Sequence, residues 1–322
     1  MNVASIKRKN IKKTGQLAKK ENIWEQMGRQ KELILMSIPF VVYALIFYYS
    51  PLIGWVMAFQ NFKPAKGFFE QKWVGFNHFV FMFSDKTFLT VIRNTLAMSI
   101  IILVLGFIFS IGFALLLNEV RQIKVKKFIQ TVSYLPHFLS WIIVTGIVLD
   151  ALSTETGIIN HLLMYFNIIQ SPINFLADPK YFWGIVGLSN VWKSTGWGSI
   201  IYLAAITAIS PDLYEAASID GANRLQKIRH ITLPSLKPTI FILLIINMGN
   251  VLNAGFEVQY LLGNGLVQSV SQTIDIFVLK YGIGLTNYSL ATAAGIFRSV
   301  ISIILIVIAN YAAKAAGEER LF

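Results

Sequence analysis

The chain has 322 residues, of which 55% are hydrophobic and only 14% charged, and it contains no cysteine. Soluble domains carry about 25% charged residues, so this composition excludes an ordinary soluble protein and indicates a chain that crosses a membrane several times. The lack of cysteine excludes a disulfide framework, a thiolate metal site and a thiol nucleophile.

The net charge of +12 comes mainly from a basic N-terminal segment and from short runs beside apolar stretches. Nine Lys/Arg precede residue 32. We interpret this pattern as a membrane-topology signal that also favours anionic lipid, and we expect no nucleic-acid partner. The basic lead and the apolar run after it are both too long for a cleaved signal peptide. Residues 1–32 are therefore predicted to form a basic cytoplasmic tail.

Six apolar stretches are long enough to span a bilayer, because a spanning helix needs about 20 residues. They cover residues 33–59, 90–117, 128–149, 182–209, 239–258 and 290–312. Pro39 and Pro51 interrupt the first stretch, and candidate kinks lie at Pro136 and at residues 196–198. We expect an all-α polytopic membrane protein with six transmembrane helices in one domain, residues 33–313, followed by a tail at residues 314–322.

The distribution of Lys/Arg over the connecting segments predicts the orientation of the chain. Nineteen of the 28 fall on the side of the N-terminus and six on the opposite side. Because cytoplasmic loops are the ones enriched in Lys/Arg, both termini are predicted to be cytoplasmic, and so is the polar segment 210–237. Segments 61–85, 151–181 and 259–289 then face outward.

The cytoplasmic segment 210–237 begins with the signals of a helix N-terminus. Ser210 is suited to cap the helix and Pro211 to occupy its first position, with Asp212 and Glu215 in the first turn. We expect a short helix here.

Small residues follow in the same segment at a spacing of four, which places them on one stripe that another backbone can approach closely. They are Ala217 with Gly221 and Ser218 with Ala222. Gly221 allows the chain to bend, and Leu233 with Pro234 is expected to end a second helical piece. The predicted object is a helix, a bend and another short helix.

This segment resembles the EAA loop of ABC importer permeases. The family pattern is Glu-Ala-Ala, three residues, Gly, nine residues and Ile-x-Leu-Pro, and every position is filled by Glu215, Ala216, Ala217, Gly221, Ile231, Leu233 and Pro234. The resemblance implies the type I ABC importer permease fold. It also implies that these residues, with Asp220 and Ala222, dock into an ATPase subunit and couple it to the pore.

Segments 134–138, 157–160 and 191–197 look like the carbohydrate-importer permeases, and more narrowly like their LplB-type oligosaccharide branch. The likeness covers about residues 30–320. It implies a multi-pass subunit of the bacterial cell membrane that pairs with a second homologous permease, two ATPase subunits and an extracytoplasmic sugar-binding protein. That binding protein is expected to dock on the outward segments.

Catalytic motifs are missing from the sequence. It has no GxxxxGK[ST] phosphate loop, no HExxH, CxxC or GxSxG, and its four histidines lack metal-ligand spacing. We expect a subunit with no catalytic residue, metal or cofactor of its own, whose partner ATPase binds ATP and Mg.

Four polar residues in the fifth stretch are candidates for the substrate path: Asn247, Asn250, Asn253 and Glu257. On a continuous helix they share a face about 120° wide. Lipid-facing polar groups are costly, so this face points to protein or water. It is either a stripe that contacts sugar or a set of contacts between helices.

Lys193 and Arg298 lie within predicted spans, where cations are functional candidates. One or both attract an acidic sugar such as an oligouronide, or they are structural. In the structural alternative they extend to the outer interface, or Arg298 pairs with Glu257.

Together these features predict the transmembrane subunit of an ATP-driven oligosaccharide importer. The alternative is an ion-coupled secondary sugar transporter, which should show internal repeats and buried carboxylates. Glu257 is the one candidate coupling carboxylate in the spans.

Overall fold

The computed structural model describes residues 29–317, which divide into two compact units at residues 55 and 56. The predicted tails, residues 1–32 and 314–322, lie largely outside the described residues. In the first unit, α2 (Lys31–Ala44) continues into a π-helical turn, η1 (Leu45–Tyr49). A 3-10 helix, η2 (Ser50–Phe59), follows and contains the boundary between the two units. Pro39 lies inside α2 without ending it, whereas the helix type changes just before Pro51.

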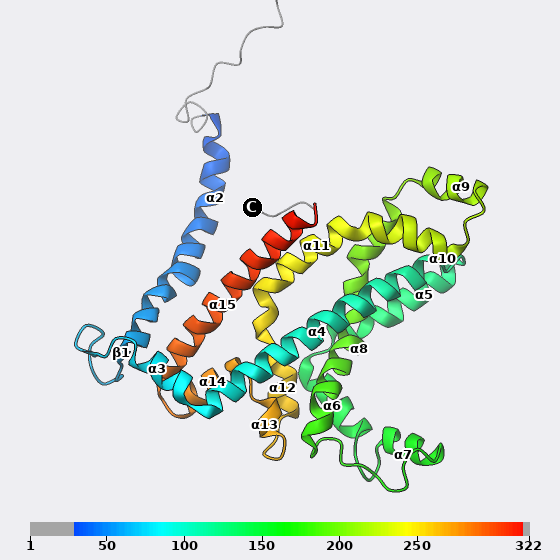
Figure 1. Ribbon diagram of the computed structural model, residues 1–322. Helices are drawn as coiled ribbons and strands as arrows, with labels where there is room; N and C mark the ends of the chain where they lie inside the picture. The colour runs from blue at the N-terminus through cyan, green and yellow to red at the C-terminus, as the bar shows by residue number, and fades with distance from the viewer. Residues whose placement is uncertain (1–28, 318–322) are drawn as a thin grey trace, which may run out of the picture. The chain divides into compact units, whose positions relative to one another are not determined.

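Within residues 56–317, the second unit consists of helices and connecting loops with one small antiparallel sheet, in which β1 (Gln60–Asn61) pairs with β2 (Lys72–Trp73). Its first helices are α3 (Asn77–Ser84), α4 (Lys86–Asn118), α5 (Ile123–Tyr134), η3 (Leu135–Phe138), α6 (Trp141–Ala151), α7 (Ile158–Tyr165) and α8 (Pro179–Thr207). Those that follow are α9 (Pro211–Ile219), α10 (Arg224–Lys227), η4 (Ile228–Thr232), α11 (Leu233–Asn250), η5 (Val251–Asn253), α12 (Phe256–Leu262), α13 (Gln268–Ser271), α14 (Ile274–Leu279), η6 (Lys280–Gly284) and α15 (Tyr288–Ala315) (Figure 1).

Several helices are long and apolar enough to cross a membrane. Within residues 29–317, four stretches qualify alone: Lys31–Phe59, Lys86–Asn118, Arg224–Leu262 and Tyr288–Ala315. Two bent pairs qualify together, α5–η3 with α6 at 102° and α8 with α9 at 69°. The all-α, multi-pass architecture is confirmed, while the number six and the cytoplasmic side of the termini stay predictions.

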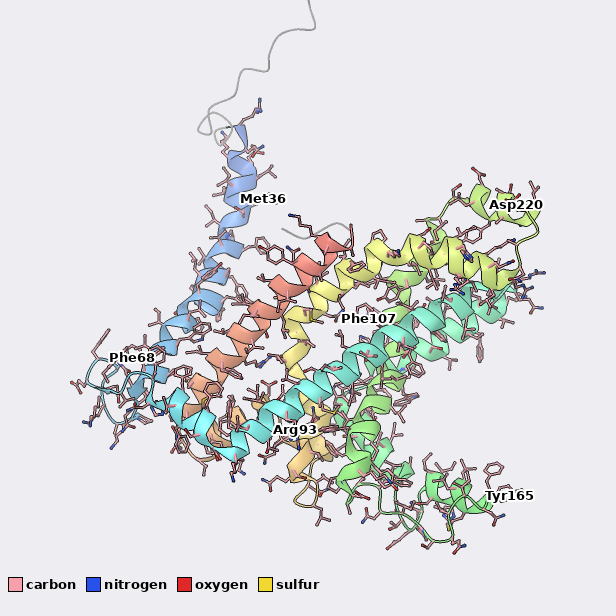
Figure 2. All side chains as sticks on the ribbon, viewed as in Figure 1. Met36, Phe68, Arg93, Phe107, Tyr165 and Asp220 are labelled. Atoms are coloured by element: carbon pink, nitrogen blue, oxygen red, sulfur yellow. The ribbon has the colours of Figure 1, made fainter. Side chains whose placement is uncertain are left out.

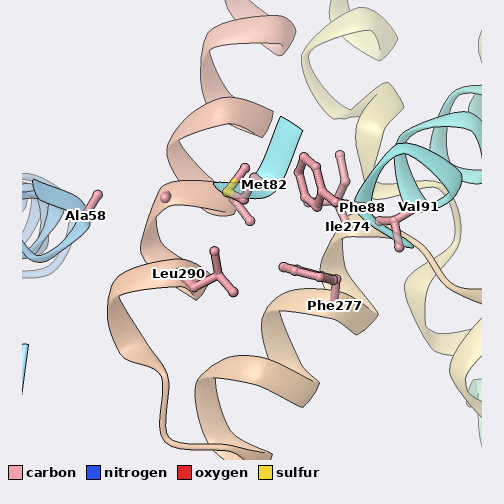
Figure 3. Packing of buried hydrophobic residues seen from close by; sticks show 9 residues of the cluster. Ala58, Met82, Phe88, Val91, Ile274, Phe277 and Leu290 are labelled. Carbon is pink, nitrogen blue, oxygen red and sulfur yellow. The ribbon is translucent and has the colours of Figure 1, made fainter. Parts of the chain in front are cut away.

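The long helices of the second unit pack in pairs. α4 lies along α8, and α11 lies along α15 (Figure 1). At one end of the unit, Phe88 of α4, Phe277 of α14 and Leu290 of α15 form a buried apolar cluster, with the two phenylalanine rings 5.1 Å apart (Figure 3). Inside a bilayer, close packing of this kind rather than the hydrophobic effect holds helices together.

The helix α8 approaches α5 very closely at Gly196. A Cβ atom at this position would lie 2.1 Å from the carbonyl oxygen of Ser133. α8 runs as one helix through residues 196–198, where a kink was predicted, so Gly196 allows close contact between helices rather than a bend.

The third predicted span does bend, since it is divided into α5–η3 and α6 just after Pro136.

Replacing Gly196 by alanine is therefore expected to lower the thermal stability of the purified protein. Overpacking of this kind costs about 1–3 kcal/mol, which exceeds the gain of about 1 kcal/mol from a better helix former. Gly184→Ala is the matched control, because a Cβ added to Gly184 on the same helix would meet no atom within 4 Å. Melting curves should place Gly196→Ala below the parent and Gly184→Ala at or above it. Equal melting temperatures would contradict the close contact.

Candidate functional site

The segment between α8 and α11 has the predicted helix start and bend. The Ser210 hydroxyl accepts a hydrogen bond from the Asp212 amide at 3.3 Å, and Pro211 begins α9. At its end, Gly221 has a φ of +78°. The Ala222 amide donates to the carbonyl of Ala217 at 2.8 Å, as in a Schellman cap. Gly221 therefore turns the chain because it adopts the left-handed conformation.

The second helical piece does not end at Pro234 as predicted. A capping box between Asn223 and Gln226 starts α10, and the helix then runs through η4 into α11. The π-helical turn η4 lies immediately before Leu233 and Pro234. A π turn shifts the backbone hydrogen-bond ladder by one residue, and a proline lacking its N–H is accommodated beside it.

Two side-chain hydrogen bonds tie α9 to the helical piece after the bend. The hydroxyls of Tyr214 and Thr232 are 2.9 Å apart, and the Lys227 ammonium donates to the Ser218 hydroxyl at 2.6 Å. These bonds hold the two pieces together as one unit, the braced segment, which runs from α9 to η4 (residues 211–232).

The nine predicted coupling residues divide by exposure. Those exposed in this chain are Glu215, Ala216, Asp220, Gly221 and Pro234, and those half-buried are Ala217, Ala222, Ile231 and Leu233. Two large apolar side chains are also strongly exposed, Ile219 at 87% and Leu225 at 74%. Figure 2 places Asp220 at the tip of the segment. An exposed patch that mixes apolar and acidic groups is suited to protein docking.

A cavity of about 470 Å³ lies between α4, α8, α11 and η5. Its polar lining consists of hydroxyl and amide side chains, namely Ser99, Ser110, Ser194, Tyr202, Asn247 and Asn250. Trp197 also lines it and stacks its ring on that of His137, with centroids 4.7 Å apart. Sequence reasoning missed the serines and Trp197, although serines within apolar stretches were the available signal.

The four polar candidates of the fifth span do not share one helical face. α11 ends at Asn250, Ala254 and Gly255 have φ values of +49° and +68°, and α12 starts afterwards. Of the four, Asn247 and Asn250 line the cavity, while Asn253 and Glu257 do not. The predicted face about 120° wide is wrong because two left-handed residues rotate α12 away from α11.

Side chains from neighbouring helices satisfy the backbone at this break. The Ser99 hydroxyl of α4 donates to the carbonyl of Val251 at 2.5 Å, and the Gln259 amide donates to the carbonyl of Ala254. Non-helical backbone at membrane depth is tolerated only where it is buried in protein or lines a cavity. Here it does both.

Lys193 is buried, with 8% of its surface exposed. Its ammonium donates to the carbonyls of Leu139 at 2.6 Å, His137 at 2.7 Å and Pro136 at 3.4 Å. These carbonyls belong to the bend between η3 and α6, so Lys193 ties that bend to α8. The alternative in which Lys193 extends to the outer interface is therefore wrong.

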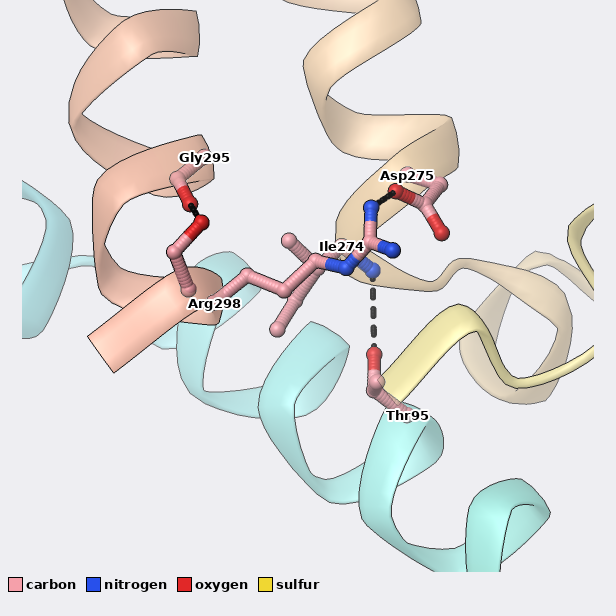
Figure 4. Close-up of polar contacts among 6 residues, drawn as sticks. Thr95, Ile274, Asp275, Gly295 and Arg298 are labelled. Atoms are coloured by element: carbon pink, nitrogen blue, oxygen red, sulfur yellow. Dashed lines mark hydrogen bonds and ion pairs between the residues drawn. The ribbon is translucent and has the colours of Figure 1, made fainter. Parts of the chain in front are cut away.

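Arg298 of α15 forms an ion pair with Asp275 of α14 (Figure 4). The predicted pairing with Glu257 is therefore wrong. Burial raises the pKa of the Asp275 carboxyl, and the Arg298 guanidinium opposes this effect. Beside the pair, the amide of Ile274 donates to the Thr95 hydroxyl of α4 at 2.9 Å (Figure 4). Asp275 lies 23 residues from Arg298, and no local pattern connects them.

A bundle of long apolar helices with a lined cavity and a braced polar segment at one end defines a membrane transport subunit. The chain belongs to the family of binding-protein-dependent transport system inner membrane components, whose family model matches residues 106–317. The localisation in a membrane and the resemblance to ABC importer permeases are thereby confirmed, and the ion-coupled alternative is disfavoured.

Two curated relatives from Bacillus subtilis cover nearly the whole chain. The chain is 41% identical to the polygalacturonan/rhamnogalacturonan transport system permease protein YteP, over 94% of each sequence. It is 43% identical to protein LplB, over 92% of each. The likeness to the LplB branch that the sequence motifs indicate is therefore confirmed.

Solved structures show the same fold. A bacterial ABC transporter involved in the import of the acidic polysaccharide alginate contains a chain that is 40% identical, with a TM-score of 0.83 over 92% of this chain and 99% of that chain. A second structure holds the alginate transporter in complex with an alginate pentasaccharide-bound periplasmic protein, with 39% identity and a TM-score of 0.84, over 92% of this chain and 98% of that chain.

Proposed function

We propose that this chain is one permease subunit of an ATP-driven importer for oligosaccharides derived from acidic polysaccharides. The observation that carries the proposal is the similarity to two transport proteins, one named for polygalacturonan/rhamnogalacturonan and one for alginate. Each aligns with more than nine-tenths of this chain, at 41% and 40% sequence identity. The working importer contains a second homologous permease, two ATPase subunits that bind ATP and Mg, and an extracytoplasmic sugar-binding protein. The binding protein docks on the outward segments 61–85, 151–181 and 259–289.

The braced segment from α9 to η4 is the surface that docks into the ATPase. Its exposed Ile219 and Leu225 supply apolar contact, and Glu215 supplies a charge for a basic partner group. The Tyr214–Thr232 and Ser218–Lys227 bonds make the segment rigid enough to pass a displacement on to α11.

The cavity is this chain's share of the sugar path. Asn247 and Asn250 present amides that can exchange hydrogen bonds with sugar hydroxyls, and Trp197, whose ring stacks on His137, adds apolar surface to the cavity. The lining residues carry no Lys, Arg, Asp or Glu, and Lys193 and Arg298 are engaged by carbonyls and by Asp275. The contacts from this chain are thus to hydroxyls, and the sugar carboxylates are recognised by the binding protein or the second permease.

Replacing Asn250 by alanine is expected to reduce oligosaccharide uptake by about two- to tenfold, because the loss of one net hydrogen bond costs about 0.5–1.5 kcal/mol. Assembly of the complex should be unchanged. Asn253→Ala is the matched control, since this residue lies three positions further on and outside the cavity lining. Equal uptake by Asn250→Ala and Asn253→Ala would show that the cavity is not part of the sugar path.

The experiment that tests the function is ATPase activity of the co-purified complex in nanodiscs, with and without sugar-loaded binding protein. Oligouronides and neutral oligosaccharides are compared. Stimulation by the oligouronide-loaded protein alone supports the proposal. Stimulation by the neutral sugar alone refutes the substrate class, and a preparation with no co-purifying ATPase refutes the importer.

A further inference from the structure

The segment between α6 and α8 carries a short helix, α7, whose apolar side chains point away from the other helices. Ile158, Leu162 and Tyr165 are 61%, 46% and 80% exposed. At 100° per residue these three lie within about 60° of one another and form a single face. Phe166 and Ile168 extend this apolar face beyond the helix end. Figure 2 places Tyr165 at the far end of the segment, away from α4 and α8.

The opposite face of α7 is fixed to its own loop by Asn160, which is 1% exposed. Its side-chain amide donates to the carbonyls of Ser153 at 3.0 Å and Ile173 at 3.1 Å, and its oxygen accepts from the Ile173 amide at 2.9 Å. Because one side chain joins both ends of the loop, the orientation of α7 is determined. The hydrogen bonds of Asn160 therefore fix the outward direction of the apolar face of α7.

The position of α7 along α8 places it near a membrane surface. α8 has 29 residues, which as an α-helix is about 43 Å, longer than the hydrocarbon core of about 30 Å. Segment 152–178 precedes the start of α8 and α9 follows its end, so α7 and α9 lie at opposite ends of this helix (Figure 1). With α9 on the ATPase side, as the proposed function has it, α7 lies at the outer surface.

Composition and continuity identify what covers the apolar face. Residues 156–177 contain no Asp, Glu, Lys or Arg, so the apolar face of α7 can enter a bilayer without the cost of taking a charged group into lipid. α6 leads into α7 over six residues, and in the half of α6 nearer to α7 it exposes Ile147 and Leu149 at 47% and 43%. A tyrosine beside aliphatic side chains is typical of the headgroup region of a bilayer.

We propose that α7 is an interfacial helix whose face of Ile158, Leu162 and Tyr165 lies in the outer surface of the lipid bilayer. The helix anchors the outer end of the bent α5–η3–α6 span in the plane of the membrane. It follows that α7 is withdrawn from the docking surface for the binding protein, and that residues 151–157 and 169–181 are the parts of this segment left for docking.

The test uses the absence of cysteine in this chain. Leu162→Cys and Tyr165→Cys are each introduced into the full complex, assembled with cysteine-free partner subunits, labelled with an environment-sensitive fluorophore and placed in phosphatidylcholine and phosphatidylglycerol nanodiscs. Quenching is measured with a phosphatidylcholine that bears a nitroxide near its headgroup, and with iodide in the water. Glu155→Cys, an exposed polar position on the same segment, is the matched control.

The lipid nitroxide should quench the labels at residues 162 and 165 several-fold more strongly than the label at residue 155, with the reverse order for iodide. Adding sugar-loaded binding protein should leave this pattern unchanged. Strong iodide quenching at residues 162 and 165, shielding that appears only with binding protein, or a label that neither quencher reaches would each overturn the proposal. The last two results would assign the face to the binding protein and to the second permease respectively. Because no readout requires transport, these outcomes are independent of the substrate proposal.

Discussion

Replacing Gly221 by tyrosine is expected to abolish co-purification of the ATPase subunit and ATP-dependent uptake, while the permease still folds. Gly221 has a φ of +78°, and a side chain in this conformation costs about 1–2 kcal/mol, which a bundle of long helices tolerates. A Cβ at this position meets no atom within 4 Å. The tyrosine ring would therefore stand on the exposed tip of the docking segment and block its insertion.

The variant Gly221→Asn distinguishes the effect of side-chain bulk from the effect of backbone strain. Asparagine tolerates the left-handed conformation, and its side chain is much smaller than that of tyrosine. We expect it to retain most of the ATPase on an affinity column, with an unchanged elution volume of the permease. Normal ATPase assembly in Gly221→Tyr would refute docking through this segment. Equal loss in both variants would mean that the turn, not the space around it, is what the ATPase requires.

Replacing Lys193 by methionine is expected to produce the largest loss of stability among these variants. The substitution leaves the carbonyls of His137, Leu139 and Pro136 without the ammonium that they now share. The Pro136 carbonyl keeps the Leu139 amide as a donor at 3.2 Å, so the carbonyls of His137 and Leu139 are the two that lose their donor. Each buried group left unsatisfied costs about 1–3 kcal/mol, so the loss is about 2–6 kcal/mol. The measurement is the melting temperature and the monodisperse yield of the detergent-solubilised complex.

Lys180→Met is the matched control for Lys193→Met, because Lys180 is an exposed lysine in the first turn of the same helix. It should melt like the parent, and Lys193→Arg should recover part of the loss because it keeps a cation with several donors. An unchanged melting temperature in Lys193→Met, together with selective loss of acidic-oligosaccharide uptake, would contradict the structural role. That result would restore the alternative in which Lys193 acts on the sugar.

The sequence by itself determined the features that depend on neighbours along the chain. Apolar stretches of sufficient length define the membrane protein, and the Ser210 and Pro211 signals begin α9 where they predict it. Gly221 bends the chain because a left-handed residue there is a local requirement of the Schellman cap. The spacing from Glu215 to Pro234 identified the family for the same reason, since a docking segment is one continuous piece of chain.

Only the tertiary structure decided the features in which distant groups satisfy one another. Arg298 pairs with Asp275 rather than Glu257 because α14 packs on α15. The span through Asn250 breaks where the Ser99 hydroxyl, 152 residues away in the chain from Val251, donates to the carbonyl that the break leaves free. In a membrane, polar side chains and backbone must find partners inside the protein, and which partners they find depends on helix packing that no local pattern encodes.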